Sequence, residues 1–395
     1  MRKQLFFIAI ASLFTSMASA ADLYVRDLGA GGSYSTISAA ITAANDGDRI
    51  IIRPKAGNLP FIENLTIDKS LSFVSEINFS NYLVQGTVSI IPLSGRVVSV
   101  QNMNLTSTFT SSADSANGRT TINVYNSTLN GGIAVNKLNT SLNISGCTVT
   151  GTISCTHGRI TGNTANKILV STNVADTSLA LDDIEIIANA VLGSNEAIWL
   201  IQKNYKAKIL NNYCAFGNIT FTDAKNLSEN EIRNNVISSG SNTGIYIGIP
   251  TGNNATFYVL NNVICPSNSS SSYYEVTNST TATATVYVRY NASNSGFTIL
   301  NCIASNNISS ASISFNATTS NATGSALVNA GAIEDDFADI NLTRNDIGNR
   351  GGSDSWENYW PTAAGNKPQV NYLNTPRRIY SGTTEMNATG SGYSK

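Results

Sequence analysis

An asparagine pair between apolar residues recurs along this chain and constrains its fold more than any other feature. It occurs as "ILNNYCA" from Ile209, as "IRNNVIS" from Ile232 and as "VLNNVIC" from Val259. The second asparagines of these pairs are 23 and then 27 residues apart. A polar corner that is followed by a strand-like apolar run, and that repeats at this interval, predicts a solenoid whose coils stack on one another.

The same position can be followed through most of the sequence. Coils of a parallel solenoid are ~4.8 Å apart, so equivalent corner residues lie directly above one another. Asparagine suits this place because it tolerates left-handed backbone and because its amide both donates and accepts hydrogen bonds. The predicted ladder is Asn102, Asn126, Asn163, Asn212, Asn235 and Asn262, with Gly146, Asp183 and Cys302 at equivalent positions. The alternative is a set of unrelated turns in an antiparallel sandwich.

The longest interval between corners, 40 residues from Asn262 to Cys302, predicts an insertion at about 266-296 that forms a protruding hairpin. Composition agrees with β structure, because 12% of residues are charged and 30 are Gly. The formal net charge of −1 gives no basic patch for nucleic acid or an anionic membrane, so neither is expected as a partner.

The N-terminus is typical of an export signal. Arg2 and Lys3 precede an apolar run from Leu5 to Phe14, and Ala18-Ser19-Ala20 provides small residues for cleavage. Residues 1-20 are therefore predicted to be a signal peptide, with the mature chain beginning near Ala21. No later apolar stretch approaches the ~20 residues of a membrane span, so no transmembrane segment is expected after cleavage. We expect an exported bacterial protein, extracellular or on the outer cell surface, with the periplasm as the alternative.

The five cysteines show no metal-site spacing. Cys147, Cys155, Cys214, Cys265 and Cys302 are scattered and odd in number, which favours buried apolar roles over a disulfide framework, although Cys147 and Cys155 are close enough in sequence to pair. With a single histidine, a zinc site that requires several His ligands is excluded by inventory.

The segment from Tyr34 to Glu76, "YSTISAAITAANDGDRIIIRPKAGNLPFIENLTIDKSLSFVSE", combines an amphipathic helix, an Asp-Gly-Asp turn and two strands. Ser35 or Thr36 can cap the helix, which places Ile37, Ala40, Ile41 and Ala44 on one face. This segment resembles the entry motif of right-handed parallel β-helix proteins of the pectate-lyase-like superfamily. The resemblance implies an all-β, right-handed parallel β-helix over 21-350 with an N-terminal capping helix (capping segment 34-76), and a C-terminal capping segment and tail over 351-395.

"DINLTRNDIG", from Asp339 to Gly348, resembles a closing motif found after the last coils of secreted bacterial β-helix proteins. Trp356, Tyr359 and Trp360 follow it and are expected to cover the last coil. Its oxygen-bearing residues are candidate calcium ligands, because Ca²⁺ prefers several oxygens from a turning loop. The candidates are Asp339, Asn341, Thr343 and Asp346. Since only two of them are carboxylates, the expectation is that no cofactor is bound, with Ca²⁺ as the alternative.

Acidic residues are sparse along the predicted coils, and "DDIE" is their one cluster. A catalytic site could be built from Asp182, Asp183 and Glu185 with Arg159 in the preceding coil. The structural alternative is that Asp182 and Asp183 occupy the corner filled by Asn-Asn in later coils.

Two functions follow. The first, which the missing catalytic constellations favour, is a noncatalytic cell-surface scaffold, adhesion or glycan-contact module whose partners are polysaccharide or other surface proteins. The alternative is a calcium-assisted polysaccharide lyase or a glycoside hydrolase that acts in a groove along the β-helix.

Overall fold

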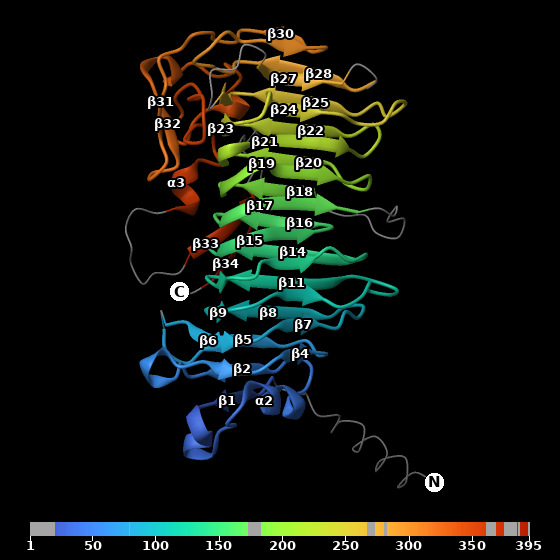
Figure 1. Ribbon diagram of the computed structural model, residues 1–395, viewed down its shortest axis with the longest axis vertical. Coiled ribbons are helices and arrows are strands. Elements are labelled where there is room, and N and C mark those ends of the chain that lie inside the picture. The colour runs from blue at the N-terminus through green and yellow to red at the C-terminus, as the bar shows by residue number, and fades with distance from the viewer. Residues whose placement is uncertain are drawn as a thin grey trace.

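The chain forms a right-handed parallel β-solenoid of about 11 turns (Figure 1). The computed structural model describes residues 20–78, 80–172, 183–266, 273–279, 283–360, 369–374, 385 and 388–393. The predicted signal peptide, apart from Ala20, lies outside the described residues, as does Asp182. Among the described residues, no helix is long and apolar enough to cross a membrane.

Each coil contributes strands to two parallel sheets. Sheet A contains β1 (Asp22–Val25), β2 (Arg49–Ile52), β5 (Ser72–Ser75), β8 (Val97–Gln101), β11 (Thr120–Tyr125), β14 (Thr140–Ser145), β16 (Gly158–Thr161), β18 (Ile184–Ile187), β20 (Ala207–Leu210), β22 (Glu229–Arg233), β25 (Thr256–Leu260), β28 (Thr285–Arg289) and β30 (Ile303–Ser305).

Sheet B has two runs of strands, which join into single long strands in the middle coils. Its strands are β3 (Phe61–Ile62), β4 (Leu65–Ile67), β6 (Tyr82–Gln85), β7 (Val88–Ile90), β9 (Met103–Leu105), β10 (Phe109–Ser111), β12 (Thr128–Leu129), β13 (Ile133–Val135), β15 (Thr148–Cys155), β17 (Thr164–Ser171), β19 (Ala190–Ile201), β21 (Tyr213–Asp223), β23 (Val236–Ser239), β24 (Thr243–Ile247), β26 (Val263–Pro266), β27 (Tyr274–Asn278) and β29 (Ile299–Leu300).

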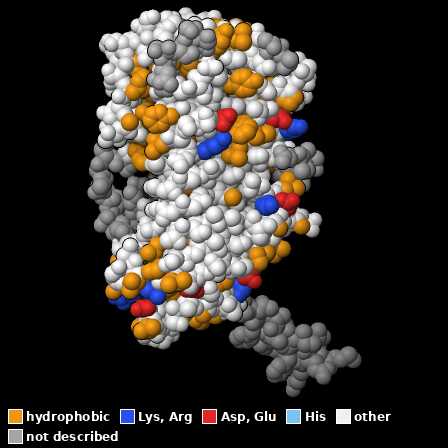
Figure 2. Space-filling view, viewed as in Figure 1, with side chains coloured by type: hydrophobic (Ala, Val, Ile, Leu, Met, Phe, Trp, Pro, Cys, Tyr) orange, Lys and Arg blue, Asp and Glu red, His pale blue; other side chains and the backbone are white. Residues whose placement is uncertain are grey.

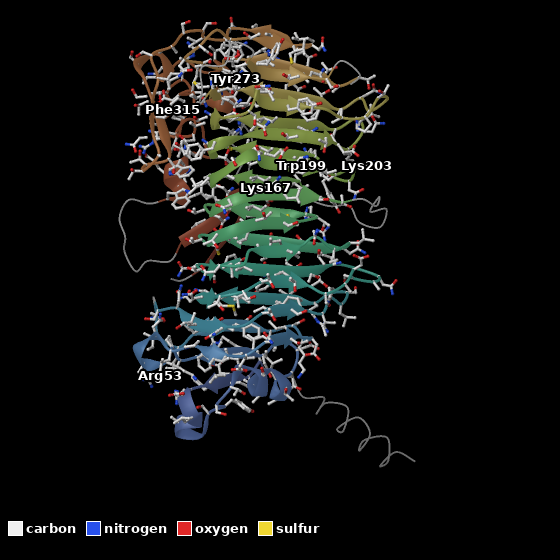
Figure 3. All side chains as sticks on the ribbon, viewed as in Figure 1. Arg53, Lys167, Trp199, Lys203, Tyr273 and Phe315 are labelled. Carbon is white, nitrogen blue, oxygen red and sulfur yellow. The ribbon has the colours of Figure 1, made fainter. Side chains whose placement is uncertain are left out.

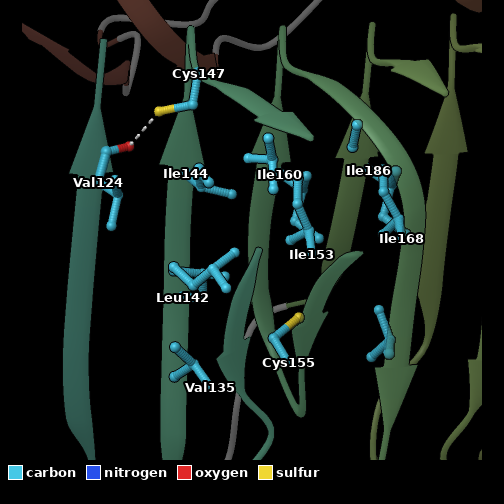
Figure 4. Packing of buried hydrophobic residues seen from close by; sticks show 14 of the residues in the cluster. Val124, Val135, Leu142, Ile144, Cys147, Ile153, Cys155, Ile160, Ile168 and Ile186 are labelled. Carbon is cyan, nitrogen blue, oxygen red and sulfur yellow. Dashed lines mark hydrogen bonds between the residues drawn. The ribbon is translucent and has the colours of Figure 1, made fainter. Parts of the chain in front are cut away.

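The core consists of apolar residues stacked from coil to coil. In sheet A, Val124, Ile144, Ile160 and Ile186 are register partners on successive strands, and all are buried (Figure 4). The alternating burial of β11 shows why the sequence permits this, since every second side chain points inward. Burying each such side chain contributes roughly 1.5–3 kcal/mol, so the stack is a large apolar contribution to stability.

The predicted N-terminal helix is present as α2 (Ile37–Ala43), at the N-terminal end of the stack (Figure 1). Thr36 is its N-cap, and the Thr36 side chain accepts a hydrogen bond from the Ala39 backbone N–H. Ile37, Ala40 and Ile41 are buried in the core. That α2 protects the end coil from water remains a prediction. Three-residue or longer 3₁₀ segments occur at Asp27–Gly32, Ala56–Asn58, Ser325–Leu327 and Asp335–Phe337.

The prediction of a protruding hairpin at about 266-296 is wrong for the described part of that segment. β27 pairs in parallel with β24 in sheet B, and β28 pairs in parallel with β25 in sheet A. The two strands therefore belong to different sheets and form an ordinary coil.

After the last coil the chain runs back along the side of the stack (Figure 1). This C-terminal segment contains the antiparallel pair β31 (Ser314–Asn316) and β32 (Asn321–Thr323), the short helix α3 (Trp356–Tyr359), and the antiparallel pair β33 (Gln369–Asn374) and β34 (Thr389–Tyr393). Trp356, Tyr359 and Trp360 do not cover the last coil. They pack on the middle coils, where Trp360 Nε1 donates to the Ala188 carbonyl oxygen. The apolar surface that these aromatic residues cover lies on the outside of the middle coils. No local sequence pattern indicates that the C-terminal segment packs there.

Candidate binding groove

A groove of about 1010 Å³ runs between the outward face of sheet A and the C-terminal segment. Side chains of β18, β20, β22, β25 and β28 form its floor, and residues between 332 and 359, together with Val370 and Leu373, form its wall. Charged and aromatic groups dominate its lining, among them Glu185, Lys208, Glu231, Tyr258, Phe337 and Asp354. The groove therefore offers polar contacts together with aromatic faces.

Successive strands of sheet A carry one outward row of side chains, and four members of this row, Glu185, Lys208, Glu231 and Tyr258, line the groove. The row consists of register partners Arg159, Glu185, Lys208, Glu231, Tyr258 and Tyr287. Strand alternation explains why they face outward, since their neighbours Ile184, Ile186 and Ile209 point into the core. The charges alternate in sign along the row before it ends in two tyrosines.

Ion pairs fix the charged part of the row. Arg159 Nε lies 2.6 Å from Glu185 Oε2, and Lys208 Nζ lies 3.0 Å from Asp183 Oδ2 and 3.9 Å from Glu185 Oε1. Burial lowers the pKa of Lys208, but the hydrogen bond to Asp183 and the charges of nearby carboxylates outweigh it, so that this pKa is raised overall. Lys206 reaches Asp183 from the side at 3.3 Å. The carboxylates here are thus compensated by cations.

The two tyrosines form a stacked aromatic pair at the other end of the row. The rings of Tyr258 and Tyr287 stack with centroids 5.6 Å apart and an interplanar angle of 11°. The guanidinium of Arg289 lies 5.4 Å from the centroid of the Tyr287 ring. Burial, with the nearby Glu229 carboxylate, raises the pKa of Tyr258, so its hydroxyl stays protonated at neutral pH. An aromatic face beside hydroxyl and guanidinium donors can contact a flat polar ligand.

The structure places the predicted catalytic residues differently from one another. Asp183, Glu185 and Arg159 are linked by ion pairs through Glu185 and Lys208, and Glu185 lines the groove, whereas Asp182 lies outside the described residues. Asp183 does not continue the asparagine ladder as the spacing predicts, because Asn189 occupies that corner. The sequence prediction lacks Lys208, Glu231, Tyr258 and Tyr287. Each lies four residues before a ladder asparagine, as Arg159 and Glu185 do, and this spacing could have found them.

The buried ladder consists of seven asparagines in successive coils. Each of the first six donates from its Nδ2 to the Oδ1 of the next at 2.9–3.0 Å, and its backbone N–H donates to the same oxygen at 2.8–3.0 Å. The members are Asn163, Asn189, Asn212, Asn235, Asn262, Asn291 and Asn307. Four predicted ladder residues are among them, but Asn102 and Asn126 stand one residue earlier in their corners, where Met103 and Ser127 take the ladder position.

The residue before each ladder position adopts the left-handed conformation. Its φ is 55° at Asn211, 55° at Asn234 and 59° at Asn261, as it is 59° at Asn102 and 44° at Asn126. The pair motif thus joins two roles. The first asparagine makes the left-handed turn and points outward, and the second makes the buried ladder.

The outward asparagines hold the wall of the groove in place. Asn211 Nδ2 donates to the carbonyl oxygens of Asn349 and Gly351 at 3.0 and 2.7 Å. Asn234 Nδ2 donates to Asn345 Oδ1 at 2.9 Å and to the carbonyl oxygens of residues 346 and 348. Asn261 Oδ1 accepts from the backbone N–H of Ala332 at 2.8 Å. Backbone carbonyls and amides of the wall are therefore satisfied by the corners.

The candidate calcium ligands make hydrogen bonds within their own loop. Asp339 Oδ1 accepts from the Gly352 backbone N–H at 2.6 Å, and Asp346 Oδ1 accepts from the Asn329 N–H at 2.6 Å. Asn341 Oδ1 accepts from the hydroxyl and the N–H of Thr343. Burial raises the pKa of Asp339. These contacts do not test whether a metal binds, so the expectation of no cofactor, with Ca²⁺ as the alternative, stays a prediction.

The cysteines of the solenoid are free thiols, so the Cys147–Cys155 pair is not formed. Burial raises the pKa of Cys147 and of Cys155 to about 12, which keeps both thiols protonated and unreactive.

The outward face of sheet B carries fewer charged side chains than the groove. In the view of Figure 2 most of the surface is uncharged. Lys167 and Trp199 lie side by side there (Figure 3), with the ammonium 4.5 Å from the ring centroid and 3.2 Å from Glu196.

Comparison of the chain with family models, with curated proteins and with solved structures finds no match. The structure alone therefore places it among parallel β-helix repeat proteins.

Proposed function

We propose that this chain is a noncatalytic, exported β-helix protein of the pectate-lyase-like type that contacts extended glycans through the groove on sheet A. The observation that carries the proposal is the outward row that passes from alternating charges to the stacked pair of Tyr258 and Tyr287. Six strands at the ~4.8 Å spacing make this row ~24 Å long, which is long enough for several sugar rings.

The chemistry of the floor supports binding over turnover. A general acid must place its carboxyl group against the leaving-group oxygen, whereas both floor glutamates have a carboxylate oxygen engaged by a basic side chain. Glu185 lies 2.6 Å from Arg159, and Glu231 lies 3.7 Å from Arg233. The remaining oxygens of these paired carboxylates can accept hydrogen bonds from sugar hydroxyls, while the exposed faces of the tyrosines stack on the rings.

A second function has one observation in its favour. Glu185 and Glu231 flank Lys208 on alternate strands, so their backbones are about 10 Å apart. Inverting glycoside hydrolases separate their two carboxyl groups by ~6.5–9.5 Å, a distance that these side chains can reach. In that case Glu231, which is more exposed, would activate water, and Glu185 would have to donate the proton.

Titration calorimetry against a panel of neutral and acidic oligosaccharides tests the first proposal. Tyr258→Ala and Tyr287→Ala should each weaken binding about tenfold, because each removes one stacking face. Tyr246→Ala is the matched control, since Tyr246 lies on sheet B and its replacement should leave affinity unchanged. If no saccharide binds, or if the control weakens binding equally, the groove is not the glycan site.

The same panel decides between binding and turnover. Product formation would be followed by reducing ends and by unsaturated sugars, with and without calcium. Turnover that is lost in Glu231→Gln, with binding retained, would establish the hydrolase. Binding without products supports the noncatalytic function.

A further inference from the structure

Asp48, which ends the turn after α2, is a buried carboxylate. Only 4% of its surface is exposed. Its Oδ1 accepts from the backbone nitrogen of Ala21 at 2.7 Å, and its Oδ2 accepts from the Asn45 N–H at 2.7 Å. These two backbone hydrogen bonds lower the pKa of Asp48, so its carboxyl group is ionised at neutral pH.

No described lysine or arginine forms an ion pair with Asp48. The charged groups around it have other partners. Arg49 pairs with Asp22 at 2.7 Å, and Asp46 accepts from the Ser70 N–H. Lys69 Nζ donates to the last carbonyl oxygens of α2 and its cap. The charge of Lys69 helps to lower the pKa of Asp48, but its Nζ is engaged by those carbonyl oxygens. A cation in direct contact with this buried carboxylate would therefore stabilise it further.

The sequence indicates how such a cation can arise at the Ala21 nitrogen, which already contacts Asp48. Ala21 directly follows Ala18-Ser19-Ala20, the small-residue pattern of a leader cleavage site. We propose that cleavage between Ala20 and Ala21 creates an N-terminal ammonium that forms an ion pair with Asp48 and completes the first coil. A leader-cleaving protease adds water to this peptide bond. The carbonyl of Ala20 becomes a carboxyl group, and the nitrogen of Ala21 gains the protons of a free amine.

The neighbouring backbone links this ion pair to the solenoid. Arg49 N donates to the Ala21 carbonyl oxygen at 2.8 Å, and Asp22 is the register partner of Arg49 in the β1–β2 pair. The ammonium thus holds the start of the edge strand β1 on β2. Because the uncleaved chain has only an uncharged N–H at this position, cleavage itself strengthens the N-terminal end of the stack.

The first test is the N-terminus of the exported protein. The full chain would be expressed with its leader in an exporting bacterial host, and the product analysed by mass spectrometry and N-terminal sequencing. The expected first residue is Ala21. Any other N-terminus overturns the proposal.

The second test is the titration of the amine by NMR in a chain that begins at Ala21. A free α-amine has a pKa of roughly 7.7–8.0. The Asp48 partner should raise this value by about one pH unit, and Asp48→Asn should restore the ordinary value. Asp46→Asn is the matched control and should keep the raised value. An amine that titrates equally in the wild type and in Asp48→Asn overturns the ion pair, whatever the stability of the variant.

Stability gives an independent measurement. At neutral pH the free-amine chain should have an unfolding equilibrium constant about tenfold lower than the N-acetylated chain. Because the folded-state pKa of the amine is raised, the stabilisation is fully present below the unfolded-state pKa and is lost as pH rises through the folded-state pKa. Acetylation should have no effect in the Asp48→Asn background, and an equal effect in both backgrounds would contradict the pairing.

Discussion

The early coils and the middle coils turn the same corner with different side chains. At Asn102-Met103 and Asn126-Ser127 the left-handed residue is asparagine, but the ladder position is not. At Asn211-Asn212, Asn234-Asn235 and Asn261-Asn262 both positions are asparagine. The middle corners are also those that bind the C-terminal segment. The difference teaches that a doubled asparagine serves two surfaces, one inside the coil and one outside it.

Removing an asparagine of the buried ladder, on the inner surface of the coil, should have the largest effect on stability. Asn235→Leu keeps the volume of the buried side chain but removes the acceptor of Asn212 and the donor to Ile209. Several buried polar groups then lack partners, so the free energy of unfolding should fall by about 3–5 kcal/mol. Urea denaturation followed by circular dichroism measures it.

Asn143→Ala provides the control for that change. Asn143 Nδ2 donates to Asn123 Oδ1 at 2.9 Å, which is the same contact between side chains, but on the outward face of sheet A. Since water can replace this bond, the loss should stay below about 1 kcal/mol. Equal losses at the two sites would mean that burial of the ladder does not determine its contribution.

Breaking the outer surface should have an intermediate effect. Asn234→Gly keeps the left-handed backbone, because glycine adopts positive φ without strain, and it deletes only the amide that binds the C-terminal segment. A loss of about 1–3 kcal/mol is expected, with faster hydrogen exchange in residues 345–351.

The same substitution at an early corner separates the effect of changing the left-handed residue from the effect of losing the contact with the C-terminal segment. Asn126→Gly also preserves a left-handed residue, and it removes one half-exposed bond to Asn102. It should change stability by a few tenths of a kcal/mol and leave exchange in residues 345–351 as it was. If it loosened that segment too, the effect would come from the coil and not from the docking contact.

The repeat was sufficient to predict the solenoid, because a polar corner followed by a strand, recurring at the length of one coil, is typical of stacked coils. It misplaced two further corners, at which the left-handed residue is neither asparagine nor glycine. Ala188 precedes Asn189 and Tyr290 precedes Asn291, so the pair pattern disappears and the predicted corners of both coils are misplaced. The supposed insertion is thus one coil of 29 residues from Asn262 to Asn291, followed by another of 16 to Asn307.

The sequence could predict part of the floor of the groove but not its wall. The outward row on its floor follows from register, since each residue of that row lies four positions before a ladder asparagine. Its wall depends on residues more than a hundred positions away, such as Asn345 and Asp346 on Asn234. Nothing local in the sequence indicates that the C-terminal segment returns to the middle coils, because its docking uses backbone carbonyl groups that every residue has.

A similarly small effect should come from the ion pair on the outward face of sheet A. Arg159 and Glu185 are 2.6 Å apart, but their side chains keep 24% and 15% of their exposure, so solvent and salt screen the attraction. A double-mutant cycle with Arg159→Gln and Glu185→Gln should give a coupling energy of about 0.5 kcal/mol, which falls further in high salt. A coupling above about 2 kcal/mol that salt does not reduce would show that the floor of the groove is as dry as the ladder beneath it. In that case the contrast between the inner and outer surfaces of the corner would not extend to the charged row.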